Sequence, residues 1–336
     1  MPEIVHFHRK PAPGNYSIES LFDSVRKATA ELGRAIEVRE LPNLSKGLWP
    51  RLYNTYWAST HKGSLNHITG DVTYIALGLP GAKTILTVHD CLALERLSGI
   101  KRWFLKKFWF DLPIQRATAV TVVSEETLRQ LVRLVPVARG KTVVIPNAIS
   151  SAFTPAPQAF NSRRPRILHI GTAFNKNLPN LCKALNGMKC DLRIVGRLKA
   201  DQILELEKNQ ISYSVTSQLT EQEIIDEYKA CDLVSFVSVY EGFGMPIVEA
   251  QWIERPVVTS NCSSMPEVAG DGACLVNPRD VSDIRQGILR ISHDADYRKS
   301  LIENGCRNRL RFSLRTVAQQ YLDVYDSVLH GRFPVI

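Results

Sequence analysis

The chain has 336 residues, of which 44% are hydrophobic and 22% are charged. These values are typical of globular proteins and exclude a disordered or fibrous chain, and the length predicts two domains of roughly 150 residues each. No stretch approaches the roughly 20 apolar residues needed to cross a bilayer. The opening segment MPEIVHFHRK lacks the charged and apolar regions of a signal peptide.

The seven cysteines are odd in number, scattered along the chain and never spaced as C-x-x-C. This pattern argues against both a disulfide framework and a zinc site. We therefore expect reduced thiols and a cytoplasmic protein.

The net charge of +9 is spread unevenly. Residues 1–155 hold 20 Lys and Arg against 12 Asp and Glu, whereas the remainder holds 22 against 21. The first half is therefore basic, which favours an anionic partner there. No zinc-finger, RRM or KH signature accompanies the charge, so we expect no nucleic-acid partner.

Short β-rich segments alternate with helical patterns through the first half. One helix is expected over 18–32, opening after Ser17 and stopping at Gly33, and another over 124–134 with Ser124 as its N-cap. The expected strands are EIVHFH at 3–8, AIEVREL at 35–41, KTILTVHD at 83–90, AVTVVS at 119–124 and KTVVIPN at 141–147.

The alternation restarts after FTPAPQAFNSRRP at 153–165, a proline-bearing segment that we interpret as a linker. Thr220 and Glu223 are spaced as a helix capping box, and Pro246 fits the first turn of a helix over MPIVEAQWI. The expected strands are RILHIG at 166–171, DLRIVG at 191–196, DLVSFVSV at 232–239 and RPVVTS at 255–260.

Continuous apolar strands joined by helices imply parallel sheets covered on both faces. We expect an α/β fold of two doubly wound domains, 1–155 and 160–313. The final segment, 314–336, contains the amphipathic pattern LRTVAQQYLDVYDSVL. We expect it to cross back and pack on the first domain.

Ligands of such sheets bind beyond the carboxyl ends of the strands. The strands proposed above therefore select a short list of polar positions. They are His89 and Asp90, residues 172–177, Gly196 and Arg197, and residues 241–244.

Two glutamates, Glu241 and Glu249, flank a glycine-rich turn in YEGFGMPIVEA at 240–250. A helix N-terminus preceded by glycines presents unpaired N–H groups and a partial positive charge, which suits a phosphate or a sugar hydroxyl. Two interpretations stay open on spacing alone. Both carboxylates serve one ligand site, or Glu249 complements the helix dipole while Glu241 is solvated.

The segment EGFGMPIVEA, with its two glutamates separated by seven residues, resembles the nucleotide-sugar site of retaining GT-B glycosyltransferases of the family 4 (group 1) type. The resemblance covers most of the chain from about residue 67 and implies two Rossmann-like domains facing a central cleft, the first for an acceptor and the second for a nucleotide sugar. The other matching segments, in the family's order, are HITGDVTYIA at 67–76, LTVHD at 86–90, TVVSEET at 121–127, VIPNAI at 144–149, GTAFNKN at 171–177 and VVTSNCSSMPEVAGDGACLVNP at 257–278.

The resemblance implies a role for each matching residue. Glu249 would hold the donor's ribose hydroxyls, Glu241 the transferred sugar and Lys176 the diphosphate. Without the resemblance, Lys176 would be taken for an exposed loop lysine. The other implied donor-binding residues are Gly171, Thr172, Asn177, Gly242, Phe243, Gly244 and Met245.

The chain departs from the family pattern at two places. An arginine often follows the glycine at the position of Gly171, where this chain has Thr172; Arg197 is either its substitute in binding the donor or a surface residue. The family usually shows a glycine pair near the N-terminus, whereas PAPGNYS at 11–17 offers only Gly14, a candidate on the acceptor side.

Histidines form the remaining candidates. The resemblance implies that His89 points at the transferred sugar, although a lone histidine at a strand end is usually structural. Asp90 orients His89, accepts a proton from the acceptor hydroxyl, or caps the following segment. His6, His8 and His67 are further candidates for acceptor contacts, with His6 and His8 on the same side of their strand.

The chain shows no clustered Asp-x-Asp motif and no His/carboxylate ligand set. We therefore expect neither a metal nor a cofactor. Lys176 and the helix N-terminus would neutralise the leaving diphosphate instead.

The segment KRWFLKKFWF at 101–110 combines four basic residues with five aromatics. It is either an interfacial patch for an anionic membrane, which would place the protein at the inner face of that membrane, or a helix with core aromatics and solvated charges. Charges and aromatics interleave without a clean stripe, so both interpretations stay open.

These features together predict a retaining, metal-independent hexosyltransferase that uses a nucleotide diphosphate sugar and an acceptor hydroxyl. By resemblance we favour UDP-hexose as the donor, then GDP-mannose, and a lipid-linked glycan of polysaccharide assembly as the acceptor. The alternatives are a GT-B nucleotide-sugar epimerase or phosphorylase, and a nucleotide-sugar-binding module without catalysis. GTAFNKN lacks the G-x-G-x-x-G turn, which argues against a dinucleotide oxidoreductase.

Overall fold

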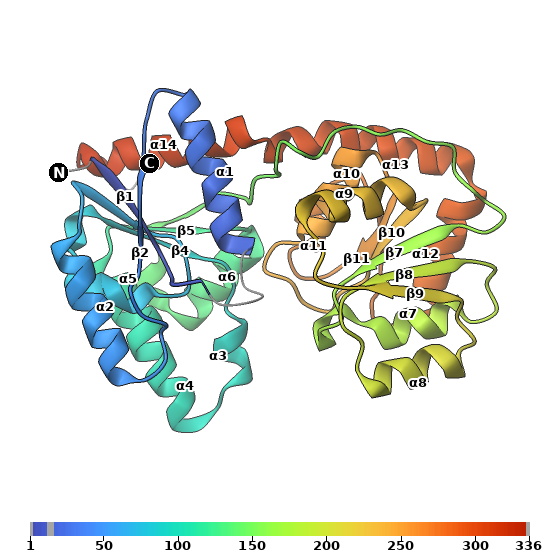
Figure 1. The fold of residues 1–336 in the computed structure, drawn as a ribbon, viewed down its shortest axis with the longest axis horizontal. Helices are drawn as coiled ribbons and strands as arrows, with labels where there is room; N and C mark the ends of the chain where they lie inside the picture. Colours follow the sequence, from blue (N-terminus) through green and yellow to red (C-terminus); the bar gives the residue numbers. More distant parts are fainter. Residues whose placement is uncertain (1–2, 12–16, 334–336) are drawn as a thin grey trace. The chain divides into compact units, whose positions relative to one another are not determined.

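The computed structural model describes residues 3–11 and 17–333, which form two compact units (Figure 1). Unit 1 contains the chain up to Ala148 and again from Ser313, and unit 2 contains Ile149–Phe312. Each unit has a six-stranded parallel sheet with helices on both of its faces. The prediction of two doubly wound α/β domains is confirmed.

In the described residues, unit 1 contains six strands and eleven helical segments. The strands are β1 (Ile4–His8), β2 (Glu37–Glu40), β3 (Leu65–Ile68), β4 (Thr84–Val88), β5 (Ala119–Val122) and β6 (Thr142–Val144). The helices are α1 (Ser17–Glu31), α2 (Leu48–Thr60), α3 (Leu92–Arg96), α4 (Gly99–Leu105), α5 (Leu112–Arg116), α6 (Glu125–Leu134) and α14 (Leu314–Leu329). Shorter turns are η1 (Thr73–Gly78), η2 (Gly81–Lys83), η3 (Lys106–Asp111, a π-helix) and η4 (Pro136–Ala138).

The sheet of unit 1 has the order β2-β1-β3-β4-β5-β6, and each neighbouring pair is parallel. The chain moves outward from β1 to β2 and then returns to β3 on the other side of β1. This reversal makes the carboxyl end of β1 and β3 a topological switch point, where open α/β sheets bind ligands.

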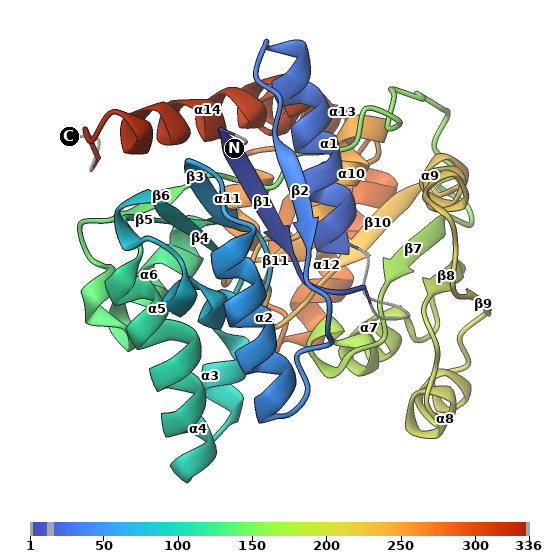
Figure 2. The ribbon, with the colours of Figure 1, turned by 60° about the vertical axis from the view of Figure 1, so that its left-hand side comes forward.

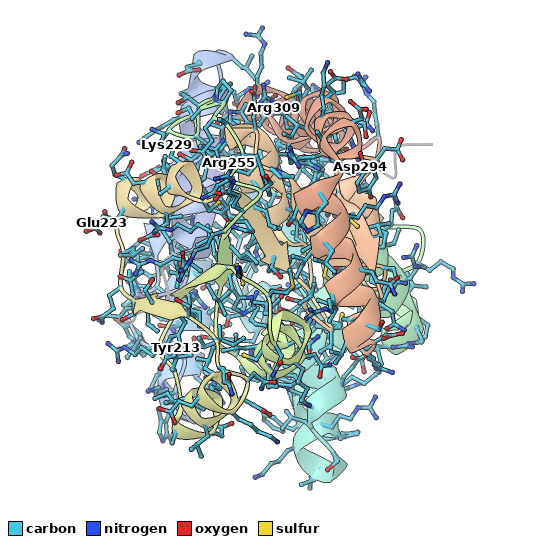
Figure 3. All side chains as sticks on the ribbon, turned by 90° about the vertical axis from the view of Figure 1, so that its right-hand side faces the viewer. Tyr213, Glu223, Lys229, Arg255, Asp294 and Arg309 are labelled. Carbon is cyan, nitrogen blue, oxygen red and sulfur yellow. The ribbon has the colours of Figure 1, made fainter. Side chains whose placement is uncertain are left out.

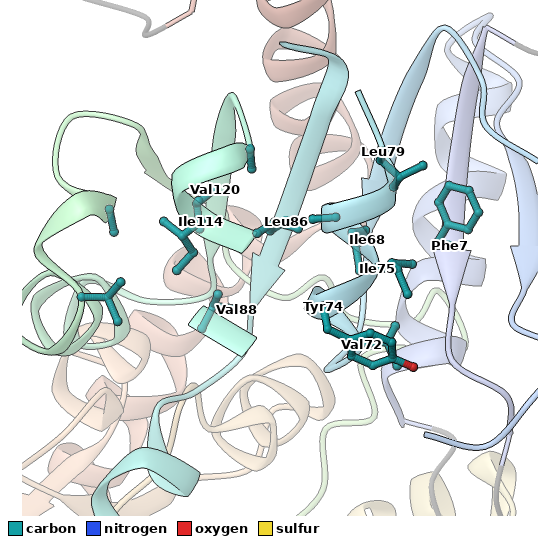
Figure 4. Packing of buried hydrophobic residues seen from close by; sticks show 14 of the residues in the cluster. Phe7, Ile68, Val72, Tyr74, Ile75, Leu79, Leu86, Val88, Ile114 and Val120 are labelled. Carbon is teal, nitrogen blue, oxygen red and sulfur yellow. The ribbon is translucent and has the colours of Figure 1, made fainter. Parts of the chain in front are cut away.

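Alternation along the strands divides the core of unit 1 into two layers. Figure 4 shows one layer, in which Phe7, Ile68 and Leu86 of the sheet pack with Tyr74 and Ile114. The other layer lies between the sheet and the pair α1 and α14, which pack on each other (Figure 2). The C-terminal helix therefore forms part of the core of unit 1.

Unit 2 repeats this architecture. Its strands are β7 (Arg166–Ile170), β8 (Asp191–Val195), β9 (Tyr213–Thr216), β10 (Leu233–Phe236), β11 (Val257–Ser260) and β12 (Cys274–Val276). Its helices are α7 (Leu178–Leu185), α8 (Ala200–Lys208), α9 (Glu221–Ala230), α10 (Met245–Ile253), α11 (Met265–Ala269), α12 (Val281–His293) and α13 (Ala295–Asn308), with the short turns η5 (Phe174–Lys176) and η6 (Arg309–Phe312).

The predicted helix caps are present in the structure. Ser124 Oγ accepts a hydrogen bond from Thr127 N at 3.0 Å, and Thr220 and Glu223 form the reciprocal capping box at the start of α9. Figure 3 shows Glu223 at this helix start and Asp294 at the start of α13, where the Asp294 carboxylate accepts from Tyr297 N at 2.9 Å.

The proline-bearing segment 153–165 contains no helix or strand, and its first part is attached to unit 2. Arg255, labelled in Figure 3, is only 3% exposed. Its guanidinium donates to the carbonyls of Ala156, Lys229 and Cys231 at 2.7–2.8 Å. This arginine therefore ties the segment to α9 and the end of α10.

Candidate active site

The candidate site of unit 2 lies where three of its strands end. The sheet order is β12-β11-β10-β7-β8-β9, so β10, β7 and β8 are neighbours. The chain reverses its direction of travel across the sheet between β9 and β10, which makes the gap between β7 and β10 the switch point. The loops at 171–177, 196–197 and 241–244 follow these strands and are therefore brought together.

The glycine-rich turn after β10 leads directly into α10. Gly244 is the N-cap with φ of 116°, and a Cβ there would lie 3.2 Å from Ile247 Cδ1, so a larger residue would be both strained and crowded. Met245 begins α10, and the first N–H groups of a helix have no partner within it. Together with the positive end of the helix dipole, they can bind a phosphate.

Phe243 contributes to this turn through its backbone. Its side chain is 5% exposed and packs edge-on against Phe312, with ring centroids 5.6 Å apart. Ser264 Oγ lies 2.6 Å from the carbonyl of Phe243 and donates to it. The ring is therefore part of the core, and its packing holds the turn in place.

Lys176 and Glu241 form an ion pair at the switch point. Lys176 Nζ lies 2.7 Å from Glu241 Oε1, and both side chains are less than one fifth exposed. The same carboxylate oxygen accepts a hydrogen bond from Asn175 Nδ2 at 3.1 Å. Lys176 Nζ also lies 4.7 Å from the centre of the Phe236 ring, which favours a cation. These contacts fix the carboxylate of Glu241 through one oxygen.

Gly171 makes room for Lys176. Its φ is +90°, and a Cβ at this position would lie 2.9 Å from Lys176 Cε and 3.1 Å from Cγ. Any other residue would displace the lysine stem or the loop. The glycine is therefore required by the path of the Lys176 side chain as well as by its own backbone.

Two serines that follow β11 hold the backbone of Glu241. Ser263 Oγ donates to the carbonyl of Glu241 at 2.7 Å and accepts from its N–H at 3.2 Å. Ser264 Oγ lies 3.0 Å from the same carbonyl. Both serines were missed as site residues, and Asn175 was included only within the range 172–177, without a role of its own. All three stand within the matching segments GTAFNKN and VVTSNCSSMPEVAGDGACLVNP.

Glu249 is the central residue of α10 and is hydrogen-bonded to Tyr228 of α9. Tyr228 Oη donates to Glu249 Oε2 at 2.5 Å. Burial raises the pKa of Glu249 to about 7, although the Tyr228 hydroxyl and Lys176 act in the opposite direction. Burial also raises the pKa of Tyr228 well above its usual value. Glu249 therefore changes its charge near neutral pH, and nothing in the sequence pattern pointed to Tyr228.

Thr172, Asn177 and Arg197 surround these groups in different ways. Thr172 Oγ1 donates to the carbonyl of Arg197 at 2.7 Å, which joins the loops after β7 and β8. The guanidinium of Arg197 is exposed and makes no hydrogen bond or ion pair within the described residues. Asn177 is 8% exposed and donates to the carbonyls of Val237 and Pro278. The side-chain amide of Asn177 is thereby used in holding the loop, and its predicted part in donor binding stays a prediction.

His89 of unit 1 ends β4. Its Nε2 lies 2.8 Å from the carbonyl of Thr69, so this nitrogen carries the hydrogen. Burial lowers the pKa of His89, which keeps the ring neutral at neutral pH. Nδ1, which makes no hydrogen bond within the described residues, is then an acceptor. The ring can accept a hydrogen bond from a hydroxyl group.

Asp90 is exposed and caps the segment that follows it. Its Oδ1 accepts from Leu92 N at 2.9 Å, at the start of α3. This contact is the third of the roles considered for Asp90. The capping bond gives the residue a structural function beside His89.

The three other histidines of unit 1 belong to its interior. His6 Nε2 and His67 Nδ1 each lie 2.8 Å from Tyr325 Oη, and both histidines are 0% exposed. His8 is 6% exposed and lies 2.8 Å from a guanidinium nitrogen of Arg26. Burial lowers the pKa of all three, to about 3 for His8 and His67.

This burial corrects the prediction that these histidines contact an acceptor. The strands that carry them face α1 and α14. The C-terminal helix was expected to pack on this unit, but Tyr325 was not predicted as the partner of His6 and His67. Gly14, the fourth acceptor-side candidate, lies outside the described residues.

Residues 3–11 and 17–333 contain no disulfide, no metal-ligand cluster and no membrane-spanning helix. All seven cysteines lie in the described ranges, and none of them forms a disulfide bond there. No group of three or more His, Cys, Asp or Glu side chains in those ranges is arranged to hold a metal ion. Among residues 3–11 and 17–333, no helix has both the length and the apolar character that a bilayer crossing needs.

Both units match known protein families. Residues 151–308 match the family described as "Glycosyl transferases group 1", and residues 19–153 match "Glycosyltransferase Family 4". The two matches together cover most of the chain and meet close to the boundary between the units.

Relatives of similar sequence include two mannosyltransferases. The chain is 23% identical over 283 residues to the serotype-specific mannosyltransferase WbdA of Escherichia coli, covering 74% of this chain and 34% of that protein. It is 26% identical over 288 residues to the MMP alpha-(1->4)-mannosyltransferase of Mycolicibacterium hassiacum, covering 78% and 68%. The chain thus spans about a third of the length of WbdA.

The fold is similar to that of a solved glycosyltransferase from Rickettsia africae ESF-5. The TM-score is 0.77 at 19% sequence identity, and the alignment covers 98% of this chain and 99% of that chain. The similarity therefore extends over both units.

Proposed function

We propose that this chain, a GT-B glycosyltransferase that combines a family 4 unit with a group 1 unit, transfers a hexose from a nucleotide diphosphate sugar to an acceptor hydroxyl and retains the anomeric configuration. The observation that carries the proposal is the cluster of Lys176, Glu241 and Glu249 beside the N-terminus of α10. One cation, two carboxylates and a helix N-terminus at a switch point match the chemistry of a diphosphate flanked by two sugars.

Each group of the cluster has a part in donor binding. Glu249 accepts hydrogen bonds from the ribose hydroxyls, and its partner Tyr228 holds the carboxylate in position. Glu241 accepts from hydroxyls of the transferred hexose through Oε2, because Oε1 is already engaged by Lys176. The N–H groups at the start of α10 and Lys176 bind the diphosphate.

The transfer step needs charge stabilisation and positioning. The acceptor oxygen bonds to the anomeric carbon on the face that the diphosphate leaves, and the bond from that carbon to the diphosphate oxygen breaks. The acceptor's proton passes to the departing diphosphate. Lys176 and the start of α10 stabilise the charge that develops there. His89 of unit 1 offers Nδ1 as an acceptor for a hydroxyl group of a substrate.

The diphosphate needs positive charge beyond Lys176, since Glu241 partly neutralises that lysine. Thr172, which stands where an arginine is often found, carries no positive charge. Arg197 is joined to Thr172 through its carbonyl, and its guanidinium has no carboxylate partner in the described residues. We therefore assign Arg197 to the diphosphate, with Arg197→Ala expected to weaken donor binding and leave the fold unchanged.

The identity of the sugar is the finer part of the proposal. The sequence analysis favoured UDP-hexose and then GDP-mannose, whereas the two relatives described above carry mannosyltransferase names. We therefore place GDP-mannose beside UDP-glucose at the head of the donors to be tested. A glycan, lipid-linked or free, is the proposed acceptor class.

The experiment is a panel of UDP-, GDP- and ADP-sugars, each assayed for binding by calorimetry and for release of the free nucleotide. Binding with release identifies the donor, and the anomeric configuration of the product is then read by NMR. Binding without release in the presence of glycan acceptors would support a binding module instead. An inverted product would contradict the retaining step.

The same assay tests metal independence. Activity is measured before and after a chelator is added in excess. We expect an unchanged rate, because the cluster offers a cation and a helix N-terminus to the diphosphate. A loss of activity that a divalent cation restores would contradict this part of the proposal.

A further inference from the structure

Two helices of unit 1 expose large apolar side chains. On α2, Trp49 is 78% exposed and Tyr56 is 65% exposed. On α4, Ile100 is 81% exposed and Trp103 is 60% exposed. The other members of this surface, which we call the α2–α4 face, are Leu48, Leu52, Tyr53 and Phe104, each at least 43% exposed.

The two helices are neighbours. The guanidinium of Arg51 on α2 lies 4.6 Å from the centre of the Trp109 ring on η3, the segment that continues α4. A groove between them is lined by Arg51 together with Ile100, Lys101 and Phe104. The groove joins the two helices, so their exposed side chains lie on neighbouring elements of unit 1.

The same two segments hold the positive charge of the first half. Residues 44–60 and 97–110 contain six Lys and Arg and no Asp or Glu, and one of the six, Lys106, is paired with Asp111 just beyond the second segment at 2.8 Å. The rest of residues 1–155 has 14 basic and 12 acidic residues and is nearly balanced. The basicity of the first half is thus concentrated where the exposed aromatic residues lie.

The segment 101–110 takes part in this face only through its first four residues. Lys101, Arg102, Trp103 and Phe104 are exposed, whereas residues 105–110 are half-buried. Leu105, Trp109 and Phe110 pack against the core of unit 1. The interpretation of core aromatics therefore holds for residues 105–110, whereas residues 101–104 have the exposure that an interfacial patch requires. The apolar surface of α2 was not identified from the sequence.

We propose that the α2–α4 face is a docking surface for an anionic lipid bilayer. Tryptophan and tyrosine are the side chains that settle at the boundary between headgroups and acyl chains, because their rings are apolar with one polar atom. Lysine and arginine around them attract anionic headgroups. The combination of exposed Trp and Tyr with basic residues and no acidic residue fits a lipid surface better than a protein partner, whose interface would contain compensating charge.

This inference does not depend on the proposed transfer reaction, and its test contains no nucleotide sugar. The full chain is mixed with vesicles of phosphatidylcholine, alone or with added phosphatidylglycerol, and separated by flotation. We expect the chain to float with the phosphatidylglycerol vesicles and not with phosphatidylcholine alone, and to float less as salt is raised.

Two variants locate the binding surface. Trp49→Ser with Trp103→Ser removes the interfacial aromatics, and Lys101→Glu with Arg102→Glu reverses two charges; each is expected to weaken vesicle binding on the order of tenfold or more. The control is Leu204→Ser with Leu310→Ser in unit 2, two side chains of similar exposure at 64% and 62%. It is expected to bind as the unchanged chain does.

Three results would overturn the proposal. The unchanged chain stays in solution with both vesicle types, or both α2–α4 variants bind as it does. The third result is that neither the unchanged chain nor Trp49→Ser with Trp103→Ser floats, while sedimentation shows that only the unchanged chain self-associates without lipid. That outcome would assign the face to a second copy of the chain.

Discussion

Lys176 Nζ lies 2.7 Å from Glu241 Oε1, although the two residues are 65 positions apart in the sequence. The contact forms because β7 and β10, the strands that precede them, are neighbours at the switch point of the sheet. A cation and a carboxylate in contact can each be shared with a ligand. The pair therefore links the proposed binding of the diphosphate to the proposed binding of the sugar.

Replacing Lys176 by Ala should slow transfer strongly. The ammonium is proposed to stabilise the departing diphosphate, and loss of one such group costs about 10²–10³ in rate. Lys176→Arg should retain part of the activity, since it keeps the charge. The measurement is kcat/KM with the identified donor, and the control is Lys183→Ala, an exposed lysine of α7. Equal rates for Lys176→Ala and the control would contradict the role.

Gly171→Ala should weaken donor binding by displacing Lys176. Its Cβ would lie 2.9 Å from Lys176 Cε, and the φ of +90° costs an alanine about 1–2 kcal/mol. Gly33→Ala is a matched control, because Gly33 has φ of +87° and nothing within 4 Å of the added Cβ. Calorimetry should show normal donor affinity for Gly33→Ala alone. Normal affinity in both variants would mean that the Lys176 position is unimportant for binding.

Donor binding should strengthen as the pH rises through about 7, the value to which burial raises the pKa of Glu249. A protonated carboxyl cannot accept from both ribose hydroxyls, so affinity should fall about tenfold for each pH unit below that value. The dissociation constant of a nucleotide sugar, measured from about pH 5.5 to about pH 9, gives the midpoint. Glu249→Gln should bind weakly and without this dependence.

The free energy of unfolding depends on pH with the opposite sign to donor binding. The folded chain holds the Glu249 proton more tightly than the unfolded chain, whose carboxyl has the ordinary pKa of 4.5. The contribution of this group to the free energy of unfolding is therefore present at low pH and is lost as the pH rises from about 4.5 to about 7.

Tyr228→Phe should shift the midpoint of donor binding to higher pH. The Tyr228 hydroxyl donates to Glu249 and lowers its pKa, so removing it favours the protonated carboxyl. The measurement is the same pH series. Tyr213→Phe, at an exposed tyrosine on β9, is the control. A midpoint that stays in place would show that Tyr228 only fills space beside α10.

Tyr325→Phe should destabilise unit 1. Tyr325 Oη contacts the buried rings of His6 and His67, and a buried polar group left without its partner costs about 1–3 kcal/mol. Four of the five tryptophans lie in unit 1, so a Trp252→Phe background makes fluorescence report on that unit. Urea unfolding is compared with Tyr56→Phe on the exposed side of α2. A change within about 0.5 kcal/mol would contradict the network's role.

Much of the fold could be predicted because local signals agree with it. The apolar runs RILHIG and DLRIVG, predicted as strands, correspond to β7 and β8. Thr220 and Glu223 form the predicted capping box of α9. The sequence analysis did not name β3, β9 and β12 as strands. In β3 the polar residues Asn66 and His67 interrupt the apolar run, β9 is an exposed edge strand, and β12 has only three residues.

The candidate site was predictable where one short segment carried it. Lys176 and Glu241 follow strands that the alternation located, and Glu249 lies in the helix that Pro246 marked. The family resemblance supplied their roles. Tyr228 could not be found in this way, because its contact with Glu249 depends on how α9 packs beside α10. His6 and His67 were misjudged for a similar reason: the partner that buries them comes from α14, more than 250 positions away.

The most direct test of the account measures binding and turnover on the same sample, for the unchanged chain and for Glu241→Gln. The identified nucleotide sugar is titrated, and release of the nucleotide is followed with an acceptor present. We expect both proteins to bind the donor, since Glu249 and the start of α10 remain. The variant should release nucleotide at least about 10²-fold more slowly than the unchanged chain. Equal release by both, or none by the unchanged chain with any donor, would contradict the proposal that this cluster carries glycosyl transfer.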